Sequence, residues 1–267
     1  MIYLKPKTEK EMLSFVNQYK DFFIFCGGTD LTLKLKKQPL AGVIDISSLN
    51  QYRYIKKENS TIYIGALTTI NTILEDNYIK NYIPLLSEVS KEFASHQIRN
   101  IATIGGNIAN ASPVSDLIAP LLVLDTKVIL LSLAGEREIP LYQLFDGFKS
   151  LTLKDEVIVS FKIELKENQH YYRKVGSRAK LNISKLSLAM VKTDENYYLS
   201  GASLNPYTKR FYSVEKLLES GEFNDEKILE CLEKDIAPSG SFRSTKEYRF
   251  RVLLNMINEA LESFKNV

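Results

Sequence analysis

The chain has 267 residues, a formal net charge of +3 and an apolar content of 45%. These values are typical of a globular protein with two or three subdomains, and the small net charge gives no support for nucleic-acid binding. We find no apolar stretch of the roughly 20 residues that a membrane span needs, and no apolar core of a signal peptide at the N-terminus. The two cysteines, Cys26 and Cys231, are too few for an iron–sulfur cluster and are typical of reduced thiols in a cytoplasmic protein.

Residues 1–50 predict alternating strands and helices. IYL is typical of a short strand, and Thr8 followed by Glu11 forms a capping box for a helix that runs to about Tyr19. FFIFC and GVIDIS are apolar runs of strand length, and GGTDLTLKLKK between them predicts a turn and a short helix.

Residues 51–166 predict a second group of elements. YRYIKKENSTIYIGALTT is a hairpin pattern with its turn at 58–60, and Thr68 or Thr69 can cap the helix that follows. A helix is expected over 84–93, because Pro84 suits a first turn. VILLSLAGEREIPL predicts two strands around a turn at 134–135, and EVIVSFKIEL is the longest strand candidate.

The pattern changes after Lys166. The segment 170–205 predicts three strands, and helices are expected near 214–220, 224–235 and 244–264, the last with one apolar face. We therefore expect residues 167–267 to form a separate α+β domain.

Two glycine pairs are candidates for binding an anion. Gly27–Gly28 follows a predicted strand, and Gly105–Gly106 lies in TIGGN. Glycine permits unusual backbone conformations and close approach of a ligand, and exposed amides in such turns bind anions. Neither pair matches GxGxxG or the P-loop pattern, and each taken alone can be an ordinary turn. Together, with polar residues after each, they favour an extended diphosphate.

Asp116 is a second candidate. Its carboxylate can accept hydrogen bonds from ribose or ribityl hydroxyls, or it can cap the helix predicted over 117–124. The two histidines, His96 and His170, have no partner at ligand spacing, so no metal site is predicted. No serine lies in GxSxG, so serine hydrolase chemistry has no support.

Longer motifs resemble a known family. GGTDL, IGALTTI and SHQIRNIATIGGNIANASPVSDLIAPLLVLD resemble the FAD-binding module of molybdenum hydroxylases, a family that includes the flavoprotein subunits of xanthine dehydrogenase and aerobic carbon monoxide dehydrogenase. Downstream, YRKVGSRAKLNISKLSLA and IAPSGSFRSTKEYRFRVLLNMI are similar to the C-terminal domain of these subunits. The resemblance is co-linear over about 6–261.

The resemblance implies an α+β fold. It implies a two-subdomain FAD-binding module of the vanillyl-alcohol-oxidase-like (PCMH) type over residues 1–166, divided into about 1–50 and 51–166. A C-terminal domain with a three-stranded sheet and helices follows over 167–267.

The resemblance also implies a function. Such a subunit holds FAD, without a covalent link, and passes electrons from 2Fe–2S clusters to NAD⁺ or another acceptor. A small subunit carries the clusters and a large subunit carries the molybdenum cofactor. A free-standing FAD-dependent oxidoreductase and a non-catalytic nucleotide-binding scaffold are the alternatives.

The resemblance assigns residues to FAD by motif. The first loop contributes Cys26, Gly27, Gly28, Thr29, Asp30 and Leu31. The second loop contributes Thr103, Gly106, Asn107 and Asn110, and the hydroxyl-bearing part of FAD is assigned to Ser115 and Asp116. The residues assigned near the flavin are Phe93, Ala94, Ile158 and Lys174.

Each flavin assignment has a plainer alternative. Lys174 can be a solvated strand lysine, and Phe93 and Ile158 can be ordinary core residues. The chain departs from the family at Cys26, where alanine or a similar small residue is common, and it lacks the extra cysteine-bearing loop of members with their own cluster. Tyr171 and Tyr172 are candidates for the tyrosine that covers the flavin in some members.

Overall fold

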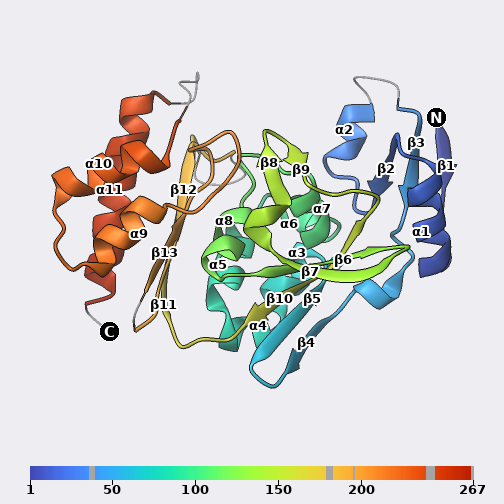
Figure 1. Cartoon of the computed structure of the whole chain (residues 1–267), viewed down its shortest axis with the longest axis horizontal. Coiled ribbons are helices and arrows are strands. Elements are labelled where there is room, and N and C mark those ends of the chain that lie inside the picture. The colour runs from blue at the N-terminus through green and yellow to red at the C-terminus, as the bar shows by residue number, and fades with distance from the viewer. Residues whose placement is uncertain (36–39, 179–182, 195, 239–243, 266–267) are drawn as a thin grey trace.

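The computed structural model describes residues 1–35, 40–178, 183–194, 196–238 and 244–265. The chain mixes helices with three larger sheets and one two-stranded sheet, which is the expected α+β class (Figure 1). The sheets follow one another along the chain, and the last sheet stands between two groups of helices.

The first sheet is parallel and has the strand order β1-β3-β2. Its elements are β1 (Ile2–Leu4), α1 (Glu9–Gln18), β2 (Phe22–Phe25), α2 (Leu31–Leu35) and β3 (Gly42–Asp45). The N-cap half of the predicted capping box is confirmed, because the Thr8 hydroxyl accepts a hydrogen bond from the Glu11 amide at 3.2 Å. The Glu11 carboxylate accepts from the Lys7 amide at 2.7 Å and not from the Thr8 amide. Met12 of α1 and Ile44 of β3 are buried in the same small core.

The second sheet is antiparallel, with the order β4-β5-β10-β6-β7. Its strands are β4 (Ile55–Glu58), β5 (Thr61–Gly65), β6 (Lys127–Ser132), β7 (Gly135–Pro140) and β10 (Val157–Glu164). Both predicted hairpins are confirmed, although the second turn lies at 133–134, one residue before its predicted place, and the longest predicted strand is the central one. The register of β10 shifts at a β-bulge between Ile158 and Ser160, which changes the face that the following side chains reach. Phe161 therefore joins the main core, although Val159, two residues earlier, joins the core of the first sheet.

Helices between β5 and β6 cover this sheet and enclose the main core. They are α3 (Ile70–Glu75), α4 (Asn77–Tyr82), α5 (Pro84–Glu92), α6 (His96–Arg99), α7 (Ile104–Ala109) and α8 (Ile118–Val123). The remaining short elements are η1 (Asn50–Tyr52), η2 (Leu141–Leu144), β8 (Phe145–Gly147) and β9 (Ser150–Leu151).

The third sheet is antiparallel, in the order β11-β12-β13. It consists of β11 (Gln169–Val175), β12 (Leu186–Lys192) and β13 (Tyr197–Ser200), followed by α9 (Tyr212–Glu219), α10 (Asp225–Asp235) and α11 (Lys246–Ser263). The middle strand is buried on both faces. Leu188 and Met190 pack against these last helices, while Ala189 and Val191 join the main core beside α8. The third sheet therefore packs directly on α8 and the main core (Figure 1).

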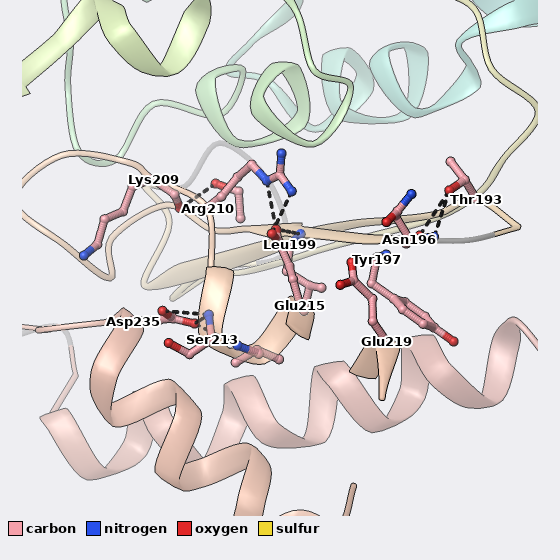
Figure 2. Close-up of polar contacts among 12 residues, drawn as sticks. Thr193, Asn196, Tyr197, Leu199, Lys209, Arg210, Ser213, Glu215, Glu219 and Asp235 are labelled. Carbon is pink, nitrogen blue, oxygen red and sulfur yellow. Dashed lines mark hydrogen bonds and ion pairs between the residues drawn. The ribbon is translucent and has the colours of Figure 1, made fainter. Parts of the chain in front are cut away.

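A buried polar cluster holds the last helices to their sheet, as Figure 2 shows. The Glu215 carboxylate accepts hydrogen bonds from Arg210 at 2.7 and 2.9 Å and from the Leu199 amide at 2.7 Å. Asp235 accepts from the Ser213 amide at 2.8 Å at the start of α9. Every oxygen of these two carboxylates has a donor, which is the condition for burying a charge at low cost. In the part of the chain that the structure describes, no helix combines the length and apolar character of a membrane span.

Candidate functional site

A pocket of about 260 Å³ opens where strand β2 ends. Three stretches of chain form it: β2 with the loop and helix after it, the residue that follows α5, and the segment around α7. Eleven of the residues assigned from the sequence line this one pocket: Cys26, Gly27, Gly28, Thr29, Asp30, Leu31, Phe93, Thr103, Gly106, Asn107 and Asn110. The two glycine loops, which are 77 residues apart at Cys26 and Thr103, therefore share a site.

The first loop, residues 26–31, needs both of its glycines. A Cβ at Gly27 would lie 2.0 Å from the carbonyl oxygen of Ile101, and Gly28 has a left-handed φ of +68°. Among the described residues, the amides of 27–30 have no hydrogen-bond acceptor. This loop therefore presents free N–H groups beside the pocket, which is the arrangement that an anionic group requires.

The second loop, residues 103–107, is different. Its amides already donate to neighbouring protein atoms at 2.9–3.1 Å. The donor and acceptor pairs are Ile104 with the Thr68 carbonyl, Gly105 with the Ala66 carbonyl, Gly106 with the Thr103 hydroxyl and Asn107 with the Thr103 carbonyl. The expectation that this glycine pair forms an anion nest is wrong for these amides, because each already donates its hydrogen bond to another atom of the protein. Gly105 is needed for packing, since a Cβ there would lie 2.7 Å from Ala66.

The two loops touch each other through side chains. The Cys26 thiol and the Thr103 hydroxyl form a hydrogen bond of 3.1 Å. A Cβ at Gly106 would lie 3.2 Å from the same sulfur and 3.0 Å from the same hydroxyl oxygen. Close packing of the loops thus limits what can replace either Cys26 or Gly106.

Asp116 and Lys174 form a buried ion pair that joins the loop before α8 to strand β11. Asp116 Oδ2 lies 2.8 Å from Lys174 Nζ, and their side chains are only 12% and 5% exposed. The solvated-lysine alternative for Lys174 is therefore wrong. The helix-cap alternative for Asp116 is also wrong, because α8 begins after Leu117 without any side-chain cap.

The Asp116 carboxylate is incompletely satisfied. Its Oδ1 atom is buried and has no hydrogen-bond partner in the described part of the chain. Burial raises the pKa of Asp116, and the charge and hydrogen bond of Lys174 oppose that rise. The Tyr172 hydroxyl is also buried, and burial, followed by the Asp116 charge, raises the pKa of Tyr172.

Chain neighbours connect this pair to the pocket. The Ser115 hydroxyl donates to the side chain of Asn107 at 2.5 Å, and Asn107 lines the pocket. Lys174 also donates to the carbonyl of Glu92 at 3.3 Å, one residue before Phe93. Ser115, next to Asp116, therefore contacts one lining residue, and Lys174 contacts the residue next to another.

Besides Ser115, Asp116 and Lys174, two further assigned residues, Ala94 and Ile158, do not line the pocket. Ile158 on β10 is buried in the main core, which agrees with its core-packing alternative. Ala94 follows Phe93 and has a left-handed φ of +38°. Phe93 itself lines the pocket and packs partly against the main core, so it serves both roles.

The sequence reasoning missed other pocket residues. The lining also includes Phe22, Phe23, Ile24, Phe25, Lys34, Ala102 and Ala109. The available signal was position, because ligands bind beyond the carboxyl ends of parallel strands. An FFIF run, however, also has the pattern of a buried strand. No group of three or more potential metal ligands occurs among the described residues, and both cysteines are free.

The fold and the pocket define a nucleotide-binding flavoprotein subunit of an oxidoreductase, and comparison with known proteins agrees. A family model described as "FAD binding domain in molybdopterin dehydrogenase" matches residues 1–164. The chain belongs to this family, as an FAD-binding medium subunit of the molybdenum hydroxylase type.

Relatives of this type match most of the chain. The nicotinate dehydrogenase FAD-subunit of Eubacterium barkeri is 33% identical over 233 residues, covering 81% of this chain and 78% of that protein. The glyceraldehyde dehydrogenase medium chain of Sulfolobus acidocaldarius is 28% identical and covers 99% and 97%. A solved structure of carbon monoxide dehydrogenase from Hydrogenophaga pseudoflava is similar with a TM-score of 0.90, 25% identity and 98% coverage of each chain.

The residues around the pocket fit FAD. A dinucleotide has a diphosphate that needs N–H donors and hydroxyls that need acceptors, and it also has flat rings that need apolar walls. The free amides of the first loop, the unpartnered Asp116 Oδ1 and the phenylalanines of β2 provide these three kinds of group. FAD is therefore the cofactor of this chain.

Proposed function

We propose that the chain is the electron-transfer subunit of a molybdenum hydroxylase complex. In this proposal, it receives electrons from 2Fe–2S clusters on a small subunit and passes them to NAD⁺ or another acceptor. A large subunit with the molybdenum cofactor oxidises the substrate. The observation that carries the proposal is the pocket that both glycine loops share, where the amides of 27–30 have no acceptor among the described residues.

The proposal extends to the fold. We propose that residues 1–166 form a PCMH-type module with subdomains over about 1–50 and 51–166, and that 167–267 form a C-terminal domain. The change from a parallel sheet to an antiparallel sheet after β3, and the third sheet after β10, support these boundaries. Both cysteines are free thiols, which supports a reducing compartment such as the cytoplasm.

Each part of the pocket has a task in this proposal. The amides of 27–30 bind the diphosphate, and Asp116 Oδ1 accepts a hydrogen bond from a hydroxyl of the cofactor. Lys174 supplies positive charge near the flavin, where negative charge develops on reduction. When bound, FAD supplies chemistry that the side chains lack, because it takes up electrons singly and releases them in pairs.

Names of relatives support the partners. Similar proteins are called "Carbon monoxide dehydrogenase medium chain" and "Xanthine dehydrogenase FAD-binding subunit", which are names for parts of larger assemblies. The two cysteines of this chain cannot supply the four thiolates of an iron–sulfur cluster, so in this proposal the clusters lie on another chain.

Purification with and without candidate partner subunits tests the proposal. The chain alone should bind FAD with one-to-one stoichiometry, and acid precipitation should release all of the flavin. Substrate should bleach the flavin only when the large and small subunits are both present. Bleaching of the isolated chain by a substrate would indicate a free-standing oxidoreductase, and a chain that binds nucleotide without flavin would indicate a scaffold.

A further inference from the structure

Four consecutive backbone carbonyls at the end of α5 point toward two cations. The ammonium group of Lys174 donates a hydrogen bond to the Glu92 carbonyl at 3.3 Å. One terminal nitrogen of Arg99 lies 3.4, 2.9 and 3.3 Å from the carbonyl oxygens of Lys91, Phe93 and Ala94. Cations stabilise the carbonyl end of a helix, where the last carbonyls lack helical partners.

The turn that Arg99 contacts is strained. Ala94 adopts a left-handed φ of +38°, which is unfavourable for a residue with a Cβ. The chain then reverses into α6, whose first turn is capped by the hydroxyl of Ser95, and Arg99 at the end of α6 reaches back over the turn. A strained turn keeps its shape only when neighbouring groups hold it.

Arg99 also lies on the path to the other wall of the pocket. Two residues after it, the Ile101 carbonyl packs against Gly27 of the first loop. Ala102 and Thr103 then line the pocket directly. Arg99 does not line the pocket itself, but its guanidinium ties the Phe93 wall to the segment that carries the opposite wall.

We propose that Arg99 is a positioning residue of the cofactor pocket, which holds the turn after α5 so that Phe93 stays in the pocket wall. The inference rests on the proposed function, since the pocket is taken as the FAD site. Arg99 acts through Phe93, because Nη1 at the end of its long side chain reaches the carbonyls on both sides of the turn.

A double-mutant cycle on FAD affinity tests the proposal. The purified full-length chain, Arg99→Gln, Phe93→Ala and the double variant are titrated with FAD, with quenching of flavin fluorescence as the readout. Each single variant should bind FAD about tenfold more weakly, and the double variant should bind about as weakly as Phe93→Ala alone. Arg99→Lys keeps the charge without the fork and should fall between Arg99→Gln and the parent.

Arg137→Gln is the control for a lost arginine charge. Arg137 pairs with Glu156 on the surface, so its loss should leave FAD affinity unchanged. Parent-like FAD affinity in Arg99→Gln, or losses that multiply in the double variant, would overturn the role of Arg99. If circular dichroism shows that Arg99→Gln is unfolded, the same cycle with Arg99→Lys decides the question. A parent chain that binds no FAD would instead refute the proposed function, and this inference with it.

Discussion

The two glycine loops look alike in sequence but serve the pocket in different ways. In the first loop, the amides of 27–30 are free, and Gly28 requires its left-handed conformation. In the second loop, the amides of 104–107 are all bonded within the protein. The first loop is therefore built to bind an anion through its backbone, whereas the second is built to pack closely.

The second loop contributes to the site through side chains instead. Asn107 receives a hydrogen bond from Ser115, which precedes the incompletely satisfied Asp116. Asp116 contrasts with Glu215 in the C-terminal cluster, where each carboxylate oxygen has a donor. A fully satisfied buried carboxylate stabilises the fold, whereas an unpartnered oxygen beside a pocket is available to a ligand.

Among the variants that test the two loops, Gly27→Ala should have the largest effect on FAD affinity. The new Cβ would overlap the Ile101 carbonyl oxygen, so either the first loop or the segment before the second loop must move. We expect FAD affinity to fall by about a hundredfold or more, and the free energy of unfolding to fall by about 1–3 kcal/mol. Flavin fluorescence titration and thermal unfolding measure the two effects.

Gly147→Ala is the matched control for Gly27→Ala. A Cβ at Gly147 meets only Ser150 at 3.7 Å, an ordinary contact. This variant should keep the FAD affinity of the parent. If Gly27→Ala kept the same FAD affinity as Gly147→Ala, the close contact between Gly27 and Ile101 would not be required for FAD binding.

Asp116→Asn tests whether the incompletely satisfied carboxylate before α8 serves the site. Asparagine retains an oxygen for Lys174 but loses the charge that accepts a cofactor hydroxyl. FAD affinity should fall by about 1–3 kcal/mol, the usual scale for a hydrogen bond to a charged group. Glu215→Gln should lower the melting temperature without changing FAD affinity, and the opposite pattern would reverse the roles assigned to the two carboxylates.

Comparison of the parent with Asp116→Asn should also reveal how the Asp116 carboxyl makes stability depend on pH. Burial raises the pKa of Asp116 in the folded chain above its ordinary value of 3.8, so the folded state binds this proton more tightly than the unfolded state does. The resulting stability is present below 3.8 and is lost as the pH rises through the folded pKa. The parent should therefore lose free energy of unfolding relative to Asp116→Asn over that range. Denaturant titrations of both proteins without FAD measure the difference, and a parent that gains relative stability would contradict the direction of the pKa shift.

Gly28→Ala and Gly106→Ala compare the loops directly. At Gly28, the left-handed conformation costs alanine about 1–2 kcal/mol, and the new Cβ also collides with the Phe25 ring. FAD affinity should therefore fall about tenfold. At Gly106, alanine favours helix α7 but makes tight contacts with Thr103 and Cys26, so the two effects oppose each other. We expect a change in FAD affinity of less than about threefold for Gly106→Ala. If Gly106→Ala lost more FAD affinity than Gly28→Ala, the diphosphate would be assigned to the second loop instead of the first.

Cys26→Ala should have the smallest effect. It removes a hydrogen bond between a thiol and the Thr103 hydroxyl, and thiols are weak donors and acceptors. The free energy of unfolding should change by less than about 1 kcal/mol, with FAD affinity unchanged. A large loss of flavin from the purified variant would show that the thiol is needed to align the loops.

Much of the candidate site could be found from sequence because its residues lie in two short motifs. Cys26 to Leu31 and Thr103 to Asn110 reach one pocket, as the resemblance implied. The roles of single side chains were harder to assign. Arg99 lies inside the quoted motif, but nothing in the sequence shows that its guanidinium turns back toward Phe93 and not toward solvent.

Local physical chemistry in the sequence alone determined where most elements begin and end. Thr8 and Thr69 cap their helices, and short hairpin turns separate β4 from β5 and β6 from β7, because caps and turns depend on neighbours within a few residues. Only the tertiary structure decided which glycine pair keeps free amides, and that Asp116 pairs with Lys174 and not with a helix end. The reason is that hydrogen-bond partners of the loops come from distant segments: Asp116 and Lys174 are 58 residues apart, and the Ala66 carbonyl that occupies the Gly105 amide belongs to another turn. Spacing along the chain carries no information about such partners until the sheets and helices have packed.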